Sequence, residues 1–556
     1  MDSTFLRLLE WFAGPRPAGP PGYLLPRWLF LRALGLIYFS AFYSLVFQIR
    51  GLLGPEGLLP AGMYLQQVAG YFGPARYWYA PTLLWFASSD GALLALCWAG
   101  MIASLLLFFN LWPRGMLVVC FAMFLSFVSA AQEFSGYQSD GMLLTAGFVS
   151  LFFVPRGLRP GWGEAEPPSR GSLLLLQILW FTIYFESGLA KYLGGDPSWH
   201  NLTAMDEYYQ NGPLPTWIGW YAQQLPHWFH AGTVVFTLVV ELILVWMLFL
   251  PRPFRIACFT IVTLLQIGII LTANYAMLNY LVLTLGILLV DDLYLVRFFP
   301  KRWIRPVQDN LARPRPAAGV LSLNAQPAET GSSQAFGEPS RGIWPKAALA
   351  IASTAARCVT AAVLLWLLYA NVYLVLERLR MSGALPARPL TLLEPFRIAN
   401  QYGLFGRMTW KRYEIEFQGS EDGRNWTAYA FKNKPQNPAD APRIYAPYQP
   451  RFDWNLWFAS LGYWRENPWV VRCEQLLLTG DRDVQALFAA NPFPRDPPKQ
   501  VRAVLWQYWF TDFATKRSTG KWWRREYIGL YAPALERVAD GKFVVTALPE
   551  SLPEPP

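Results

Sequence analysis

Long apolar stretches alternate with short polar links along most of the chain. Nine apolar segments lie near residues 28–48, 91–110, 115–134, 139–154, 172–190, 232–250, 256–273, 277–296 and 358–376. A helix needs about 20 apolar residues to cross a bilayer, with a range of roughly 17–25. Most segments meet that length, although the fourth is short and follows a polar start, YQSDG. The pattern predicts a polytopic α-helical membrane protein with about nine spans.

The segments around these spans have their own patterns. Residues 2–13 place apolar side chains at helical spacing, which is typical of an amphipathic helix on a membrane surface, and a Pro/Gly-rich link follows. Residues 301–343 include a stretch rich in Pro, Gly, Ser and Ala, which indicates a flexible linker. We therefore expect a cytosolic helix and link (1–27), a transmembrane core of about eight spans (28–300), a cytosolic linker (301–343) and a ninth span (344–380).

Residues 381–556 show the pattern of a folded domain. KRYEIEFQGS (411–420) and WTAYAFK (426–432) alternate around the turn EDGRN, and VRAVLWQYWF (501–510) alternates again, which indicates strands. FDWNLWFASLGYW, CEQLLLTG and DVQALFAAN have helical patterns. The sequence predicts an α+β domain that contains a small β-sheet.

Basic residues divide the links into two groups. With a cytosolic N-terminus, the cytosolic flanks hold Arg7, Arg27, Arg114, Arg156 and Arg252, whereas the long 191–231 loop on the other side holds only Lys191. This alternation follows the positive-inside rule and predicts an extracytosolic C-terminal domain, lumenal or periplasmic. The expected location is the endoplasmic reticulum membrane in a eukaryote or the inner membrane in a bacterium, and the compact length favours a bacterial protein.

Composition narrows the class of partner. The chain is 54% hydrophobic and 15% charged, against roughly 25% charged in soluble domains. In a membrane protein, the basic residues behind a net charge of +10 first indicate how the chain is oriented across the membrane. No Lys/Arg-rich segment lies apart from the membrane flanks. The lipid bilayer is therefore an expected partner and nucleic acid is not. Five cysteines without a CxxC pair support neither a disulfide framework nor a zinc site, so no metal is expected.

Ionisable residues gather at the predicted extracytosolic ends of the spans: Glu133, Asp140, Glu186 and Lys191. Such groups are costly near lipid unless they pair or face a cavity. One interpretation makes Lys191 a desolvated base, tuned by the acids, in an enzyme acting on a lipid or quinone-like substrate at the outer leaflet. The other makes these residues structural pairs or interfacial anchors.

Glu241 lies near the centre of a predicted span, where it either holds helices together or serves a proton or substrate, as in a transporter. No GxSxG, Walker A, GxGxxG or HExxH motif occurs. An enzyme is therefore the less favoured expectation, and no cofactor is expected.

Aromatic residues are densest in APYQPRFDWNLWFASLGYW (446–464). An exposed surface of this kind would suit a client protein, since Trp, Tyr and Arg dominate interface energetics. The candidate client-binding residues are Arg451, Asp453, Trp454 and Trp457. In the alternative interpretation the helix, which is apolar on several sides, is buried between the sheet and the membrane surface.

The stretches PFRIANQYGLFGRMTWKRYEIEFQGSEDGRNWTAYAFKNKP (395–435) and APYQPRFDWNLWFASLG (446–462) resemble the lipase maturation factor family, and the resemblance covers nearly the whole chain. It implies a multi-pass membrane protein that assists the folding, assembly or secretion of lipases or other extracytosolic clients. In animals this family works in the endoplasmic reticulum membrane. The implied partner is an immature lipase or another secreted protein, and the resemblance sets no oligomeric state.

The membrane part also resembles, more weakly, the transmembrane module of vitamin K-dependent carboxylases. In that module a Lys follows an Ala/Gly-rich helix end and precedes a Trp, much as Lys191 precedes Trp199. A second adjacent Lys is absent, because Tyr192 follows, and the spacing is longer. These departures argue against carboxylase chemistry.

Overall fold

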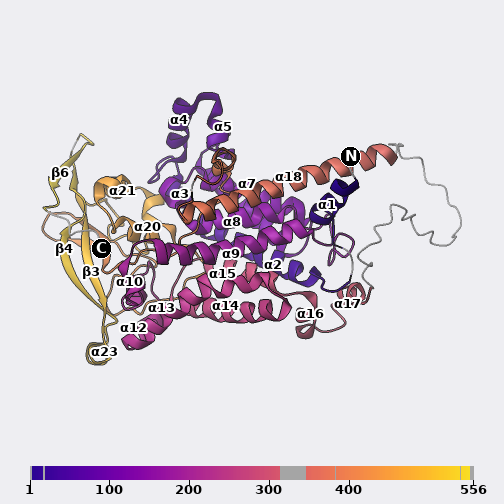
Figure 1. Cartoon of the computed structure of the whole chain (residues 1–556). Helices are drawn as coiled ribbons and strands as arrows, with labels where there is room; N and C mark the ends of the chain where they lie inside the picture. The colour runs from indigo at the N-terminus through magenta and orange to yellow at the C-terminus, as the bar shows by residue number, and fades with distance from the viewer. Residues whose placement is uncertain (1–2, 17–18, 314–345, 382, 539, 551–556) are drawn as a thin grey trace.

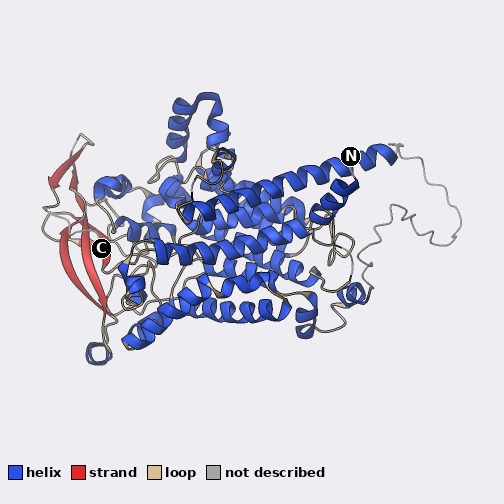
Figure 2. Cartoon of the chain, in the orientation of Figure 1, coloured by secondary structure: helices blue, strands red, loops and turns tan. Residues whose placement is uncertain are grey.

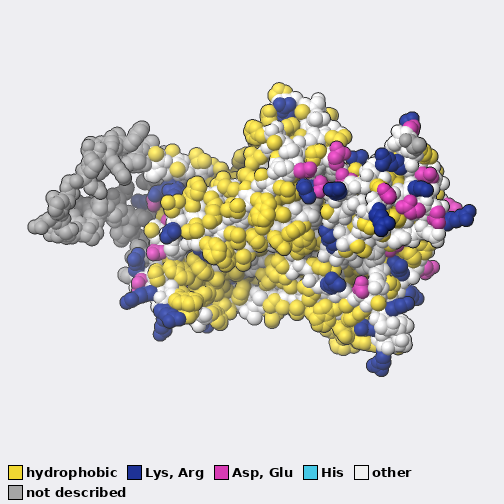
Figure 3. Space-filling view, turned by 180° about the vertical axis from the view of Figure 1, so that it is seen from behind, with side chains coloured by type: hydrophobic (Ala, Val, Ile, Leu, Met, Phe, Trp, Pro, Cys, Tyr) yellow, Lys and Arg dark blue, Asp and Glu magenta, His cyan; other side chains and the backbone are white. Residues whose placement is uncertain are grey.

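The computed structural model describes residues 3–16, 19–313, 346–381, 383–538 and 540–550. A bundle of long helices forms most of the molecule, and all the strands gather at one end of it (Figures 1 and 2). A broad hydrophobic band covers the bundle on the face shown in Figure 3, with charged side chains towards its two ends. This is the surface expected of a protein that spans a membrane.

Each of the nine predicted spans coincides with an apolar helix. These helices are α2 (Leu24–Val46), α6 (Asp90–Phe108), α7 (Pro113–Val128), α8 (Gln138–Ser150), α9 (Arg170–Leu193), α13 (His227–Leu242), α14 (Arg252–Thr272), α15 (Leu278–Gly286) and α18 (Lys346–Arg378). α13 continues into the 3₁₀-helix η4 (Leu244–Phe249), and α15 into η5 (Ile287–Leu289). Among the described residues, six helices are long and apolar enough to cross a membrane, whereas α7, α8 and α15 are shorter. The membrane class is confirmed, and the count of nine spans stays a prediction.

α9 lies at the centre of the bundle. It is the most buried of the six long apolar helices and contacts α8, α13, α15 and α18. α2 and α6 also pack closely, because glycines remove side chains from their contact. A Cβ added at Gly35 would lie 3.0 Å from the Ser104 carbonyl oxygen, and one at Gly100 would overlap the Phe42 ring. Small residues at helix contacts are typical of membrane bundles.

Two short helices fall where the sequence predicted an amphipathic helix and a linker. α1 (Ser3–Ala13) is helical as predicted and packs beside α18, where Arg357 pairs with Glu10 at 3.3 Å. α17 (Arg305–Ala312) forms at the start of the predicted linker, with Val307 and Asn310 buried. Residues 314–343 of that linker lie outside the described residues.

The sheet is antiparallel and has six strands. Its order is β2 (Thr427–Ala428), β1 (Arg412–Ser420), β3 (Gln500–Phe510), β5 (Ala534–Arg537) and β6 (Phe543–Ala547), and β4 (Trp523–Leu530) also pairs with β3. The helices of this part are α19 (Arg388–Thr391), α20 (Arg451–Ala459), α21 (Pro468–Thr479), α22 (Arg482–Gln485) and α23 (Phe513–Thr519). The predicted α+β class is confirmed, and so is the hairpin, although β2 has only two residues. We refer to residues 388–550 as the sheet domain.

The links between helices separate to the two ends of the bundle. The links that follow α2, α7, α9 and α14 lie at the end that carries the sheet domain; the other end carries α1, α16 (Asp292–Leu295) and α17 (Figure 1). At that other end Arg27 donates to the Gly163 carbonyl at 2.8 Å, and Arg252 pairs with Asp291 at 2.7 Å. The grouping agrees with the alternation of basic residues along the sequence.

Candidate functional site

Lys191 and Glu241 form a buried ion pair where α9 and α13 meet. The Lys191 Nζ atom lies 2.9 and 2.8 Å from the two carboxylate oxygens of Glu241 and 2.8 Å from the Leu404 carbonyl oxygen. It also lies 5.2 Å from the centre of the Trp199 ring. Gly188 makes the close approach possible, since a Cβ there would lie 2.9 Å from the Glu241 Cβ. Three acceptors thus occupy the ammonium group, which can make three hydrogen bonds.

Hydrogen bonds hold the segment that supplies Leu404 to α9 and to residues just beyond the end of that helix. We call residues 400–409 (NQYGLFGRMT) the strap. Backbone N–H groups of the strap donate to the Glu186 carboxylate at 2.7 Å, the Ser187 hydroxyl at 3.2 Å and the Asp196 carboxylate at 2.7 Å. The Trp199 indole N–H donates in turn to a strap carbonyl at 3.1 Å. The strap is thereby fixed to the bundle just before the chain enters β1.

A second buried ion pair joins α20 to α8. The two guanidinium Nη atoms of Arg451 lie 2.7 and 2.8 Å from the carboxylate oxygens of Asp140, and one donates to the Phe134 carbonyl at 2.7 Å. The rings of Phe127 and Tyr137 lie 4.7 and 5.2 Å from the guanidinium carbon. Bidentate geometry makes this one of the stronger kinds of pair. It fixes the sheet domain to the bundle at a second point.

The four candidate client-binding residues are all buried. Arg451, Asp453, Trp454 and Trp457 are 0%, 2%, 7% and 8% exposed. α20 lies between the sheet and the bundle, so these four side chains form no open face, as in the alternative interpretation, and client binding through them stays a prediction. The physical reason is the spread of apolar residues around α20, which buries every residue of the helix except Phe458. Client contact through these residues would require the two parts to separate.

The packing of α20 between the sheet and the bundle also determines the surroundings of Asp453, Trp454 and Trp457. Asp453 accepts a hydrogen bond from the Asn433 amide at 2.9 Å, and burial raises the pKa of its carboxyl group to about 6. Trp454 and Trp457 pack into an aromatic cluster between the two parts, whose buried rings are Trp199, Tyr208, Tyr209, Tyr275, Trp454 and Trp457. These side chains stabilise the junction.

The residues considered for catalysis do not meet at one point. Lys191 pairs with Glu241, Asp140 with Arg451, and Glu186 with the strap. Glu133 is exposed in the 3₁₀-helix η3 (Gln132–Ser135). The described residues hold no group of three or more His, Cys, Asp or Glu side chains that could bind a metal ion.

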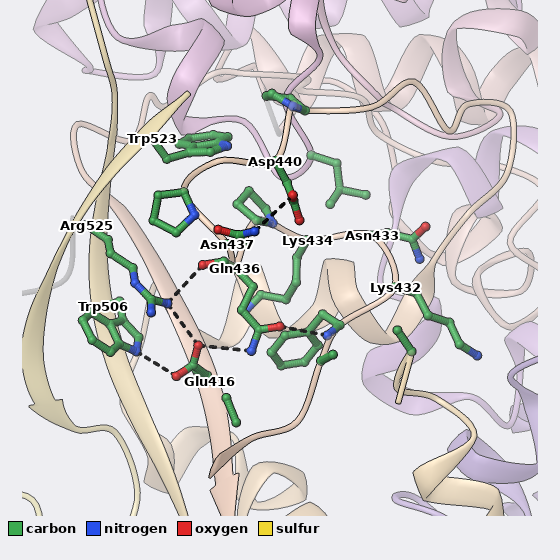
Figure 4. A pocket seen from close by; sticks show the side chains of 18 of the residues that line it. Glu416, Lys432, Asn433, Lys434, Gln436, Asn437, Asp440, Trp506, Trp523 and Arg525 are labelled. Atoms are coloured by element: carbon green, nitrogen blue, oxygen red, sulfur yellow. Dashed lines mark hydrogen bonds and ion pairs between the residues drawn. The ribbon is translucent and has the colours of Figure 1, made fainter. Parts of the chain in front are cut away.

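The sheet domain contains a polar cavity of about 680 Å³ between its strands and the 430–443 loop (Figure 4). Glu416 on β1 accepts from Trp506 on β3 at 3.3 Å and from Gln436 at 3.1 Å, and pairs with Arg525 on β4 at 3.2 Å. Across from this network, Asn437 donates to Asp440 at 3.2 Å. The exposed side chains of the lining are Lys432, Asn437, Asp440, Ala441, Arg443 and Ala489. The cavity therefore offers donors, acceptors and an indole to a polar ligand or chain segment.

Beside the cavity, charges are buried on β1. Glu414 pairs with Lys434 at 2.9 Å and with Arg412, and all three side chains are almost completely buried. Sequence patterns did not single out these residues. The available signal was their alternation, because Arg412, Glu414 and Glu416 occupy every second position at the start of β1, with Tyr413, Ile415 and Phe417 between and after them.

Comparison with known proteins identifies the family. Residues 25–297 match the lipase maturation factor transmembrane domain, and residues 398–533 match the lipase maturation factor C-terminal domain. Lipase maturation factor 2 of Gallus gallus is 31% identical, covering 95% of this chain and 84% of the relative. The chain belongs to the lipase maturation factor family. Lipase maturation factor 1 of Mus musculus is 31% identical over 97% of this chain and 93% of its own, and lipase maturation factor 2 of Homo sapiens is 32% identical over 92% and 83%.

No solved structure shows a significant match to this chain. One lipase maturation factor domain falls in each part of the molecule, and α18, β5 and β6 lie outside both matches. The transmembrane domain ends within the 3₁₀-helix η6 (Val296–Phe298), and the C-terminal domain begins just before the strap. Both ion pairs and the cavity therefore lie within the parts that define the family.

Proposed function

We propose that this protein assists the maturation of a lipase or another secreted client on the extracytosolic side of a membrane. The observation that carries the proposal is the similarity to proteins named lipase maturation factors over both the bundle and the sheet domain. The match covers 84% and 93% of the length of these two relatives.

The proposal includes a topology. The N-terminus is cytosolic and the sheet domain extracytosolic, in the endoplasmic reticulum of a eukaryote or the inner membrane of a bacterium, with the bacterial location favoured. The support is the concentration of basic residues in links at the end away from the sheet domain.

The polar cavity is the proposed contact for the client. It lies in the sheet domain, away from the hydrophobic band, and its exposed lining includes charges of both signs, Asp440 and Arg443. The deeper residues already bond to one another, which keeps the wall in place when a client segment binds. The buried residues of α20 then act by positioning the domain.

A membrane enzyme is a weaker alternative. The Lys191 ammonium group, the candidate base, is occupied by Glu241 and Leu404 and is buried under Trp199. A transporter also lacks support, because Glu241 is used in that ion pair. The family relationship favours neither alternative.

The proposed function can be tested by co-expressing a secreted lipase with the protein. The quantity measured is the secreted lipase activity per mass of lipase. The variant Asp440→Ala/Arg443→Ala should lower this activity several-fold at unchanged protein level. Arg495→Ala/Asp496→Ala is the matched control, since it removes one charge of each sign at exposed positions outside the cavity lining. Equal activity with and without the wild-type protein would contradict the proposed function. Equal activity of both double variants would contradict only the cavity as the contact.

A further inference from the structure

A small helical arm projects sideways from the bundle beside the sheet domain. We call residues 57–89 the arm. It contains α4 (Ala61–Phe72) and α5 (Arg76–Tyr79), with two 3₁₀ turns, η1 (Gly73–Ala75) and η2 (Leu83–Trp85). Figure 1 shows α4 and α5 standing out from the side of the bundle, roughly across the direction of the long helices. The arm leaves the bundle after α3 (Ile49–Leu53) and returns at the start of α6.

The composition of the arm is unusual for a projecting surface. Arg76 is its single charged residue, and eight of its side chains are aromatic: Tyr64, Tyr71, Phe72, Tyr77, Trp78, Tyr79, Trp85 and Phe86. The Arg76 guanidinium carbon lies 4.8 Å from the centre of the Tyr77 ring and 5.3 Å from that of Trp85. Tyr and Trp at this density are typical of the two interfaces of a bilayer, where each side chain meets both apolar and wet surroundings.

Many of these side chains are open to the outside. Tyr71 is 84% exposed and Phe86 is 89% exposed. The other large apolar side chains that the arm exposes are Met63, Tyr77, Trp78, Tyr79 and Leu83. A soluble surface rarely exposes so contiguous an apolar group, so the arm requires an apolar covering.

The position of the arm decides what covers it. The arm begins after α3, which follows α2, and closes where α6 begins, so it lies at the sheet-domain end of two long apolar helices, α2 and α6. Figure 3 shows hydrophobic side chains on the arm that adjoin the hydrophobic band of the bundle. The exposed aromatics are thus continuous with the surface that lipid covers.

We infer that the arm lies on the membrane, in the head-group region of the leaflet on the sheet-domain side. Its aromatic side chains enter the interface, and Arg76 is placed to meet lipid phosphates. The contact reaches the sheet domain through Trp78, whose ring centre lies 5.0 Å from that of Phe396, four residues before the strap. The arm therefore sets the tilt of the sheet domain over the bilayer.

The test measures how deep the arm lies. Phe86→Cys is made in a Cys358→Ser background, because the other four cysteines are buried, and is labelled with an environment-sensitive fluorophore. The protein is reconstituted in phosphatidylcholine/phosphatidylglycerol vesicles. Quenching is compared between nitroxide attached high on the lipid acyl chain and iodide in the water. Two controls bracket the result: Leu264→Cys on α14, which is 65% exposed, and Lys542→Cys, whose side chain is 79% exposed in the sheet domain.

We expect the Phe86 label to be quenched by the lipid-attached nitroxide at least half as strongly as the Leu264 label, and the Lys542 label to be quenched by iodide alone. Quenching of the Phe86 label by iodide alone would overturn the inference. So would a label that becomes protected only when partly folded lipase is added, since the arm would then be a client surface. Neither result bears on lipase secretion, so the proposed function is tested separately.

Discussion

Two buried ion pairs join separate elements of this molecule. Lys191 with Glu241 and Asp140 with Arg451 are pairs in which both side chains are almost fully buried. Burying an ion pair gains little over a well-packed apolar pair, but removing one partner leaves a charge that water cannot reach. The loss of stability caused by a substitution in such a pair therefore depends on whether an unpaired charge remains buried.

Lys191→Met should destabilise the protein by about 3–5 kcal/mol, because it leaves Glu241 buried without its cation. Adding Glu241→Gln removes that charge, so the double variant should recover most of the lost stability. Thermal melting in detergent measures both, and lipase secretion is assayed alongside. A double variant that melts like wild type yet loses all secretion activity would show that this pair does more than stabilise the fold.

Asp453 should make stability depend on pH. Its pKa of about 6 lies above the usual value near 3.9, so between these pH values the folded protein binds a proton that the unfolded chain releases. The free energy of unfolding then falls as the pH rises through this window, by about 3 kcal/mol at most. Asp453→Asn removes the ionisation, and it should raise the Tm at pH 7.5 but change it little at pH 4.5.

The exposed Asp496→Asn serves as the control for this pH series, and it should leave the Tm nearly unchanged at both pH values. A Tm increase for Asp453→Asn of the same size at pH 4.5 and 7.5 would contradict the assignment. The gain would then come from packing and not from a proton.

Sequence patterns identified several of these charged residues but not their partners. A charge in or next to an apolar segment is conspicuous, which is why Lys191, Glu186, Asp140 and Glu241 could be singled out. Lys191 and its partner are 50 residues apart, and Asp140 and its partner 311. Local periodicity holds no information at such separations. Glu133 looked similar in sequence but is exposed.

At the scale of elements, the close contact between α2 and α6 depends on glycine at position 100, which has no side chain. Gly100→Ala should lower the Tm, because its Cβ would overlap the Phe42 ring and overpacking costs about 1–3 kcal/mol. Gly91→Ala is the matched control on the same helix, since nothing lies within 4 Å of its added Cβ. Equal melting of the two variants would contradict close packing at Gly100.

Elements were predictable where one pattern dominates. Each long apolar helix followed from hydropathy, and β1 and β3 followed from alternation. β4 was not predicted because Arg524, Arg525 and Glu526 interrupt its pattern, and β5 and β6 have only four and five residues. α20 was predicted as a helix, but which of its sides is covered depends on the bundle, and no pattern within the helix shows that.

For the whole molecule, the proposed topology places Arg517 and Arg302 on opposite sides of the membrane. Both are exposed, in α23 and in the link before α17. In intact spheroplasts or sealed microsome-derived vesicles of known orientation, Arg517→Cys should react with a membrane-impermeant maleimide from the extracytosolic side only. Arg302→Cys should react from the cytosolic side only. Reaction of both from the same side would contradict the topology.

The strap also has a consequence for synthesis at the ribosome. Asp140 and Lys191 enter the membrane long before residues 404 and 451 are made, so the growing chain carries an acid without its arginine and a lysine with one ligand missing. Both sets are completed when residues 404 and 451 have been made and have packed against the bundle. A protein truncated before the strap would leave Asp140 without its arginine and Lys191 without its third acceptor. Packing of the strap and α20 against the bundle and burial of these charges are thus one event, so accessible charges at Asp140 and Lys191 would report a sheet domain that has not docked.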